Sequence, residues 1–150
     1  MPTYAERLSP PAVLWVVAAF LALTLGLAFY AALGAAGGLA VIAISGSVVA
    51  WVLARSAAQV RVEDGTLVAG RARIPVDLLG PVEVLDADRA RAVRGPESDP
   101  AAFHLIRGWV PAGVRAAVID PHDATPYWFV ATRRPARLAA AIEAARSPEA

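Results

Sequence analysis

The sequence contains no cysteine and no lysine, and all 14 of its basic residues are arginine. Without cysteine the chain forms no disulfides and offers no thiolate to a metal, which is compatible with a reducing compartment. The formal net charge is only +1, so no broad positive field attracts nucleic acid. These absences predict a protein with no nucleic-acid partner and no thiolate chemistry.

The longest absence is that of charge, because Ala12 to Ala54 includes no Asp, Glu, Lys, Arg or His. A membrane helix needs about 20 apolar residues to cross roughly 30 Å of hydrocarbon. The run is long enough for two crossings, and Gly34, Gly37 and Gly38 interrupt it where the chain would reverse. We therefore predict a transmembrane α-helical hairpin over residues 12–55, with two transmembrane helices at about 12–33 and 36–54.

The arginines near the ends of this run predict its orientation. Arg7 precedes the first predicted helix, Arg55 and Arg61 follow the second, and the connecting turn has no arginine. The positive-inside rule then places both termini in the cytoplasm and predicts a multi-pass protein of the inner (cytoplasmic) membrane. Residues 1–11 become a short cytoplasmic segment. A cleaved signal peptide is the alternative, but the apolar stretch is longer than that of a signal peptide.

Residues 56–150 alternate between short polar and apolar segments and predict a small β-rich α+β domain on the cytoplasmic side. Residues 59–63 and 66–69 flank Asp64-Gly65, a dipeptide typical of a β-hairpin turn. Further strands are predicted at 72–76, 82–85, 114–119 and 127–132. Leu138, Ala141, Ile142 and Ala145 recur at helical spacing, which predicts an amphipathic C-terminal helix over about 135–146.

Two motifs of this region carry a resemblance. They are the Arg-Gly-Trp at residues 107–109 and, above all, the segment from Asp123 to Pro135, with Pro-Tyr-Trp at 126–128 and Thr-Arg-Arg-Pro at 132–135. With the apolar run, they resemble the small actinobacterial membrane proteins grouped as domain of unknown function thirty ninety-three. That family has no established activity, so the resemblance implies an architecture and no catalytic residue. By element order, residues 56–150 also look like bacterial pleckstrin-homology-like (PH-like) modules, which implies a split barrel capped by the C-terminal helix.

No motif in the sequence defines a catalytic set, so we expect no enzyme activity and no cofactor. The best local cluster of potential metal ligands is Asp120, His122 and Asp123. The same spacing is common in tight turns, and we interpret it as a turn rather than as a metal site. A small metal-dependent enzyme that uses these three residues is the less favoured alternative.

The remaining candidates for binding are arginines and aromatic residues near the C-terminal helix. They are Arg133, Arg134 and Arg137, beside Tyr127 and Trp128, with Trp109 as a further contact. Arginine binds phosphate and carboxylate through two parallel hydrogen bonds, and amphipathic aromatic side chains favour the lipid interface. The same residues could instead fill the core of the domain. The sequence thus predicts a non-enzymatic membrane protein whose cytoplasmic domain binds a protein partner or the headgroups of membrane lipids, or alternatively an accessory subunit of a transport or cell-envelope complex.

Overall fold

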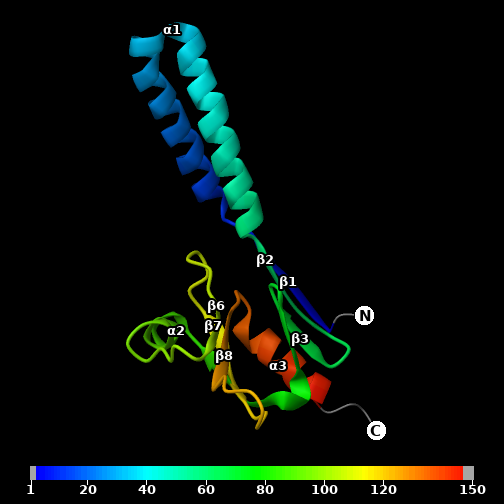
Figure 1. The fold of residues 1–150 in the computed structure, drawn as a ribbon. Helices are drawn as coiled ribbons and strands as arrows, with labels where there is room; N and C mark the ends of the chain where they lie inside the picture. The colour runs from blue at the N-terminus through cyan, green and yellow to red at the C-terminus, as the bar shows by residue number, and fades with distance from the viewer. Residues whose placement is uncertain (1–2, 147–150) are drawn as a thin grey trace. The chain divides into compact units, whose positions relative to one another are not determined.

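A computed structural model describes residues 3–146 of the chain, which divide into two compact units (Figure 1). The first, called the β unit below, combines the residues up to Leu8 with those from Ala58 onward. The second, called the helical unit, is Ser9–Ala57. The β unit is therefore built from two separate parts of the sequence, and the helical unit is inserted between them.

The helical unit consists of one helical element, α1 (Ala12–Ser56), of 45 residues. The prediction of two separate transmembrane helices is therefore wrong, because α1 is one helical element and helical structure continues through Gly37 and Gly38, which the sequence predicted as turn. Within the described residues, α1 is the one helix long and apolar enough to cross a membrane. Alanine and leucine, which dominate this stretch, are strong helix formers, and glycine after Gly34 does not end the helix.

The helical element is interrupted at a single residue. Gly34 has φ 71° and ψ −174°, a conformation that residues with a side chain rarely adopt. The chain folds back there, so that the segments before and after Gly34 lie side by side (Figure 1). A Cβ on Gly26 would lie only 2.2 Å from Cγ1 of Ile42, so the absence of a side chain at Gly26 permits this close packing.

The first sheet of the β unit has four antiparallel strands in the order β1-β2-β3-β4. They are β1 (Tyr4–Leu8), β2 (Ala58–Glu63), β3 (Thr66–Ala69) and β4 (Ala72–Pro75). The predicted turn at Asp64-Gly65 joins β2 to β3, and both residues have positive φ values. β1 is an edge strand that precedes α1 in sequence and pairs with β2, which follows α1. The two ends of α1 are thus joined to neighbouring strands.

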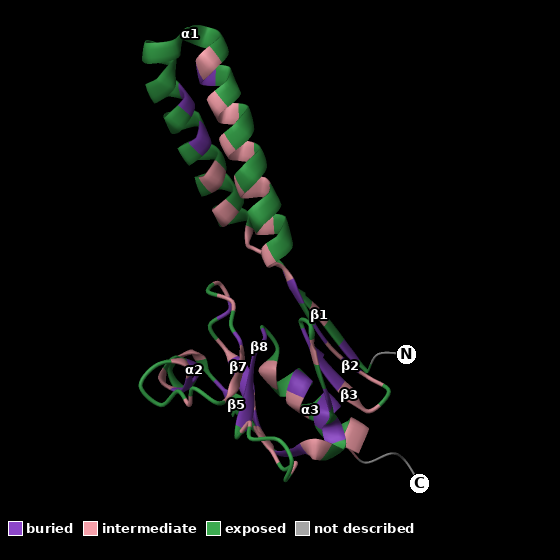
Figure 2. Ribbon diagram, in the orientation of Figure 1, coloured by how far each residue is buried: buried purple, intermediate pink, exposed green. Residues whose placement is uncertain are grey.

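The second sheet also has four strands, in the order β5-β7-β8-β6. They are β5 (Leu79–Leu85), β7 (Gly113–Val118), β8 (Tyr127–Ala131) and β6 (Phe103–Leu105), and β6 runs parallel to β8. A short 3₁₀ helix, η1 (Val76–Leu78), joins the sheets, and α2 (Ala87–Arg94) follows β5. All five residues of β8 are buried, so this central strand forms the middle of the core (Figure 2).

The last helix, α3 (Pro135–Arg146), packs against strands of both sheets. Leu138 and Ile142 are fully buried between them, on the face that the helical spacing predicted. The prediction of a β-rich α+β arrangement with a C-terminal helix is confirmed. The predicted PH-like split barrel is wrong, because the strands form two four-stranded sheets with α3 packed against both.

Candidate binding groove

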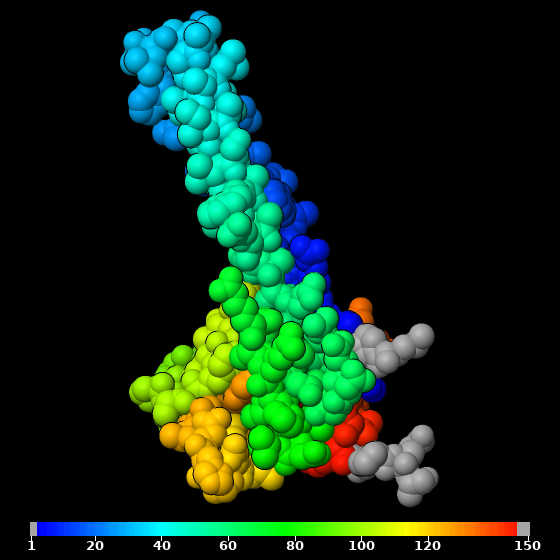
Figure 3. Space-filling view, turned by 45° about the vertical axis from the view of Figure 1, so that its right-hand side comes forward, coloured from blue at the N-terminus to red at the C-terminus, as the bar shows by residue number. Residues whose placement is uncertain are grey.

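A hollow of about 500 Å³ in the β unit lies between β1 and α3. Its β1 side is lined by Thr3, Tyr4 and Ala5. Its α3 side is lined by Arg134, Arg137, Ala140, Ala141 and Ala144. In the space-filling view of Figure 3, the red end of α3 and the blue start of the chain reach the same side of this unit. We call this hollow the β1–α3 groove.

A partly buried polar cluster fixes β1 beside the start of α3. The Tyr4 hydroxyl donates to Oε2 of Glu6 at 2.7 Å and lies 2.8 Å from Oγ1 of Thr132, and Thr132 donates to the same carboxylate oxygen. The backbone N–H of Arg133 donates to Oε1 of Glu6 at 3.2 Å. The carboxylate therefore accepts from the backbone just before α3, where the positive end of the helix dipole also favours it. These contacts set the spacing between the two walls of the groove.

The Tyr4 hydroxyl stays protonated over the physiological pH range. Burial, together with the hydrogen bond to Glu6, raises the pKa of Tyr4 from 10.0 to about 12, although Thr132 and the nearby positive charge of Arg134 oppose this rise. The rise follows from the cost of placing a phenolate in a poorly hydrated position next to a carboxylate. The Tyr4 hydroxyl therefore keeps donating its one proton to Glu6, and it cannot act as a base near neutral pH.

The charge of the groove comes from two guanidinium groups. Arg134 and Arg137 are both exposed, lie three residues apart at the start of α3 and line the groove from one side. Within residues 3–146, neither guanidinium forms an ion pair or a hydrogen bond. Arg133 differs, because its side chain donates to the backbone carbonyl of Arg7 at 3.3 Å and does not line the groove. The groove thus presents two positive charges and, along its described lining, no acidic side chain.

The structure does not bring the six binding residues predicted from the sequence together. Tyr127 and Trp128 lie in β8 and are 4% and 6% exposed. The Trp128 ring packs on Phe103 with centroids 4.2 Å apart, and the Tyr127 hydroxyl accepts from the backbone N–H of Asp99. Trp109 is half-buried against the core. Of the six residues, Arg134 and Arg137 therefore line the groove, and the three aromatic side chains pack in or against the core.

The turn with Asp120, His122 and Asp123 uses its carboxylates within the turn itself. Asp120 accepts from the backbone N–H of His122, and Asp123 accepts from that of Thr125, both at 2.9 Å. The Thr125 side chain, together with this backbone hydrogen bond, lowers the pKa of Asp123. Within the described part of the chain, no group of three or more potential ligands is gathered for a metal ion. The arrangement fits the turn interpretation.

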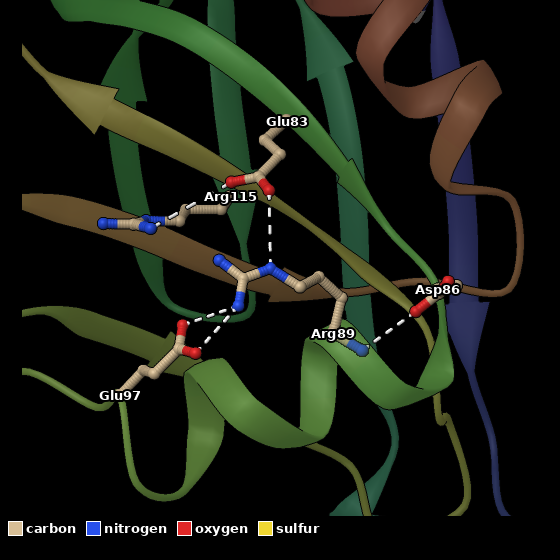
Figure 4. A network of polar contacts seen from close by, with 5 residues as sticks. All are labelled: Glu83, Asp86, Arg89, Glu97 and Arg115. Atoms are coloured by element: carbon tan, nitrogen blue, oxygen red, sulfur yellow. Dashed lines mark hydrogen bonds and ion pairs between the residues drawn. The ribbon is translucent and has the colours of Figure 1, made fainter.

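A second polar network lies around α2 (Figure 4). Asp86 caps α2 by accepting from the backbone N–H of Arg89 at 2.8 Å. The Arg89 side chain contacts Glu97 at 2.7 Å and Glu83 of β5 at 3.8 Å, and Arg115 of β7 approaches Glu83 at 4.0 Å. Each carboxylate drawn in this network contacts a positive or N–H group of the same chain, so the network holds α2 on its sheet.

Sequence reasoning missed the β1 side of the groove. Residues 3–8 show a weak alternation of large and small side chains, and Tyr4 and Leu8 become buried while Ala5 remains exposed. A strand this short and polar is recognised only when its partner strand is known, and here the partner follows the whole of α1.

These features define a class of protein: a small β-rich α+β unit interrupted by one long apolar helix, with a basic groove at its edge strand. The chain belongs to the family described as "Protein of unknown function (DUF3093)", whose model matches residues 3–142. This match confirms the resemblance to a family of unknown function noted from the sequence. No curated protein and no solved structure matches the chain.

Proposed function

We propose that this protein is a membrane-anchored, non-enzymatic binding protein. In this proposal α1 is inserted in the lipid bilayer, and the β unit presents the β1–α3 groove to an anionic group of a partner. The observation that carries the proposal is that the guanidiniums of Arg134 and Arg137 both line this groove, whose described lining includes no acidic residue.

The surface of α1 supports the membrane anchor. Large apolar side chains are exposed along its whole length, among them Val16, Phe20, Leu27, Leu39 and Trp51 (Figure 2). A soluble monomer rarely exposes so continuous an apolar surface, whereas hydrocarbon chains cover it at no cost. We propose lipid as the covering for this helix.

The connections of α1 support the placement of the β unit. Leu8, just before the helical unit, is paired with Ala58, just after it, so both ends of α1 return to one place in one sheet. The residues on either side of α1 must then lie on the same side of a membrane. Arg7 and Arg55 flank the two ends, and the positive-inside rule favours the cytoplasmic side for the β unit and for both termini.

The chemistry of the groove supports binding rather than catalysis. Guanidinium groups keep their charge at all physiological pH values and cannot accept a proton. The raised pKa of Tyr4 keeps its hydroxyl protonated as well. The two guanidiniums can therefore donate hydrogen bonds to an anion and attract it, and Tyr4 offers no base near neutral pH.

Two experiments on the full-length chain test the proposal. The first extracts membranes with alkaline carbonate, and we expect the chain to stay in the membrane fraction. The second compares the proteins that co-purify with the wild type, with Arg134→Glu/Arg137→Glu and with the control Arg71→Glu/Arg91→Glu. The control carries the same charge change on exposed arginines outside the groove.

We expect the wild type and the control to retain a common partner that the groove variant loses. Release of the chain by carbonate would contradict the membrane anchor. Recovery of the same partners with the groove variant would contradict the proposed binding site.

A further inference from the structure

The outer edge of β1 carries backbone groups that no strand of the described residues pairs with, because β1 ends its sheet. The register shows which groups these are. The backbone N–H of Gly70 donates to the carbonyl of Gln59, so the backbone groups of Gln59 face β3. Backbone groups alternate in direction along a strand, so those of the even-numbered residues of β2, such as Val60, face β1. Glu6 pairs with Val60, and the alternation then directs the backbone groups of Ala5 and Arg7 to the outer edge.

One of these outward backbone groups already accepts a hydrogen bond, and this bond confirms that the groups point outward. The carbonyl of Arg7 accepts a hydrogen bond from the side chain of Arg133 at 3.3 Å. That contact lies next to the end of β1 that leads into α1. The N–H and C=O of Ala5 lie farther along the strand, and Ala5 lines the β1–α3 groove.

The shape of the groove matches this edge. Thr3, just before β1, and the first two residues of the strand, Tyr4 and Ala5, line it, although neighbouring side chains of a strand point to opposite faces. A hollow that contacts residues of both faces extends along the edge of the strand. The opposite wall has Ala140 and Ala144, whose small side chains leave room for another backbone beside α3. Three residues in extended conformation span about 10 Å, the length of a short extended segment.

The charge of the groove selects the kind of segment. Arg134 and Arg137 lie on the α3 wall, and their guanidiniums form no ion pair within residues 3–146. The nearest carboxylate of β1, that of Glu6, already accepts from Tyr4, Thr132 and the backbone of Arg133. An acidic side chain on the incoming segment would supply the missing negative charge through bidentate hydrogen bonds.

We propose that the β1–α3 groove binds an extended acidic segment of a protein partner, which adds to the outer edge of β1 as a further strand. Backbone hydrogen bonds to Ala5 supply affinity, and carboxylates facing Arg134 and Arg137 supply specificity. This proposal rests on the proposed function and names the partner class of the same groove. A lipid phosphate would meet the arginines but would leave the strand edge unpaired, so the observations favour a peptide.

The test uses the full-length chain in nanodiscs of zwitterionic lipid, where no anionic lipid competes for the arginines. The probe is a fluorescein-labelled hexapeptide of alternating valine and glutamate, and its binding is followed by fluorescence anisotropy. We expect at least a tenfold loss of affinity for Arg134→Glu/Arg137→Glu and for the peptide with glutamine in place of glutamate. The control Arg71→Glu/Arg91→Glu should bind like the wild type.

Strand addition is tested separately from charge by N-methylation of the peptide backbone. An added strand uses every second N–H for pairing, so one alternating set of methyl groups should abolish binding and the other should not. Ala140→Trp should also block the groove, and Ala136→Trp, an exposed change on the same helix outside the groove, should not.

Three results would overturn this inference. Equal effects of the two methylation sets, with the arginine dependence intact, would exclude strand addition and leave the anion-binding function standing. Binding to vesicles with anionic lipid but not to the peptide would identify lipid as the ligand. Equal peptide affinity of the wild type and of Arg134→Glu/Arg137→Glu would contradict this inference. If that variant also kept its co-purifying partners, the proposed function would be contradicted as well.

Discussion

Leu8 and Ala58 lie directly opposite each other in β1 and β2, although the whole of α1 separates them in the sequence. Both side chains are in the core of the β unit, with Leu8 fully buried. The first strand of the unit is therefore contributed from before the helical unit. A fragment that begins after α1 would lack an edge strand, the Glu6 cluster and one wall of the groove.

This pairing predicts that a short turn can replace the helical unit. In a chain in which Asn-Gly replaces Ser9–Ala57, Leu8 and Ala58 would be joined by a two-residue hairpin, the loop that fits opposed residues of an antiparallel pair. We expect a soluble, cooperatively unfolding protein with a β-rich circular dichroism spectrum. Removal of α1 also removes the exposed apolar surface of Phe20, Leu27 and Leu39.

The matched control for this prediction is a chain that starts at Ala58. It lacks β1, so it exposes the edge of β2 and leaves Thr132 without its buried partners Tyr4 and Glu6. We expect it to unfold at clearly lower denaturant or to aggregate. Equal stability of the two chains would show that β1 does not contribute to the β unit.

The conformation of Gly34 predicts opposite effects of two glycine-to-alanine changes. Gly34 has φ 71°, where a Cβ is strained even though no atom lies within 4 Å of it, so Gly34→Ala should destabilise the helical unit by about 1–3 kcal/mol. Gly46 has ordinary helical geometry and the same open surroundings. Gly46→Ala should therefore stabilise α1 by about 0.5–1 kcal/mol.

Thermal unfolding in detergent, followed by far-UV circular dichroism, measures both glycine variants. The two positions are matched in space and differ in backbone conformation. A stabilising effect of Gly34→Ala would mean that the chain does not fold back at this residue.

The burial of Trp128 predicts that it contributes mainly to stability. Its side chain is 6% exposed and packs on Phe103, so Trp128→Ala should lower the free energy of unfolding by about 3–5 kcal/mol. Ile119→Ala serves as the control, because Ile119 is 58% exposed and its truncation should change stability by less than about 0.5 kcal/mol. Chemical denaturation followed by tryptophan fluorescence or circular dichroism gives both values. A loss below about 1 kcal/mol for Trp128→Ala would contradict a core role.

Local patterns in the sequence were sufficient for much of the β unit. The Asp64-Gly65 turn, the apolar run of β8 and the helical spacing of Leu138 and Ile142 each act over a few residues, and the structure confirms all three. The apolar run of α1 was recognised, and Gly34 does interrupt it, but Gly37 and Gly38 were also interpreted as turn. Glycine costs a helix only about 1 kcal/mol, and the surrounding alanine and leucine outweigh it at Gly37 and Gly38.

Long-range pairing accounts for what the sequence could not predict. Thr132 and Glu6 meet across 126 positions, and no local pattern indicates that residues 3–8 pair with a strand after α1. The arginines of the groove were identified by type, but Tyr127 and Trp128 were grouped with them by proximity in sequence. Side chains of β8 lie in the core, whereas those at the start of α3 reach the surface, so neighbours in the chain separate in space.

The raised pKa of Tyr4 predicts a loss of stability at alkaline pH. Below pH 10 the phenol is protonated in both the folded and the unfolded chain, so its contribution to stability is constant there. Between about pH 10 and 12 the unfolded chain releases this proton while the folded chain retains it. The free energy of unfolding should therefore fall as the pH rises through this interval, because the unfolded state binds fewer protons.

Tyr4→Phe removes this contribution and should flatten the pH dependence between pH 10 and 12. At neutral pH the same variant should lose about 1 kcal/mol, because the hydrogen bond to Glu6 is absent. Tyr30→Phe, at an exposed tyrosine of α1, controls for the loss of one phenol. Denaturant titrations at a series of pH values give the slopes. If the free energy of unfolding fell equally with pH in the wild type and in Tyr4→Phe, the Tyr4 hydroxyl would not be held protonated beside Glu6. The proposal that this cluster fixes the spacing of β1 and α3 would then be contradicted.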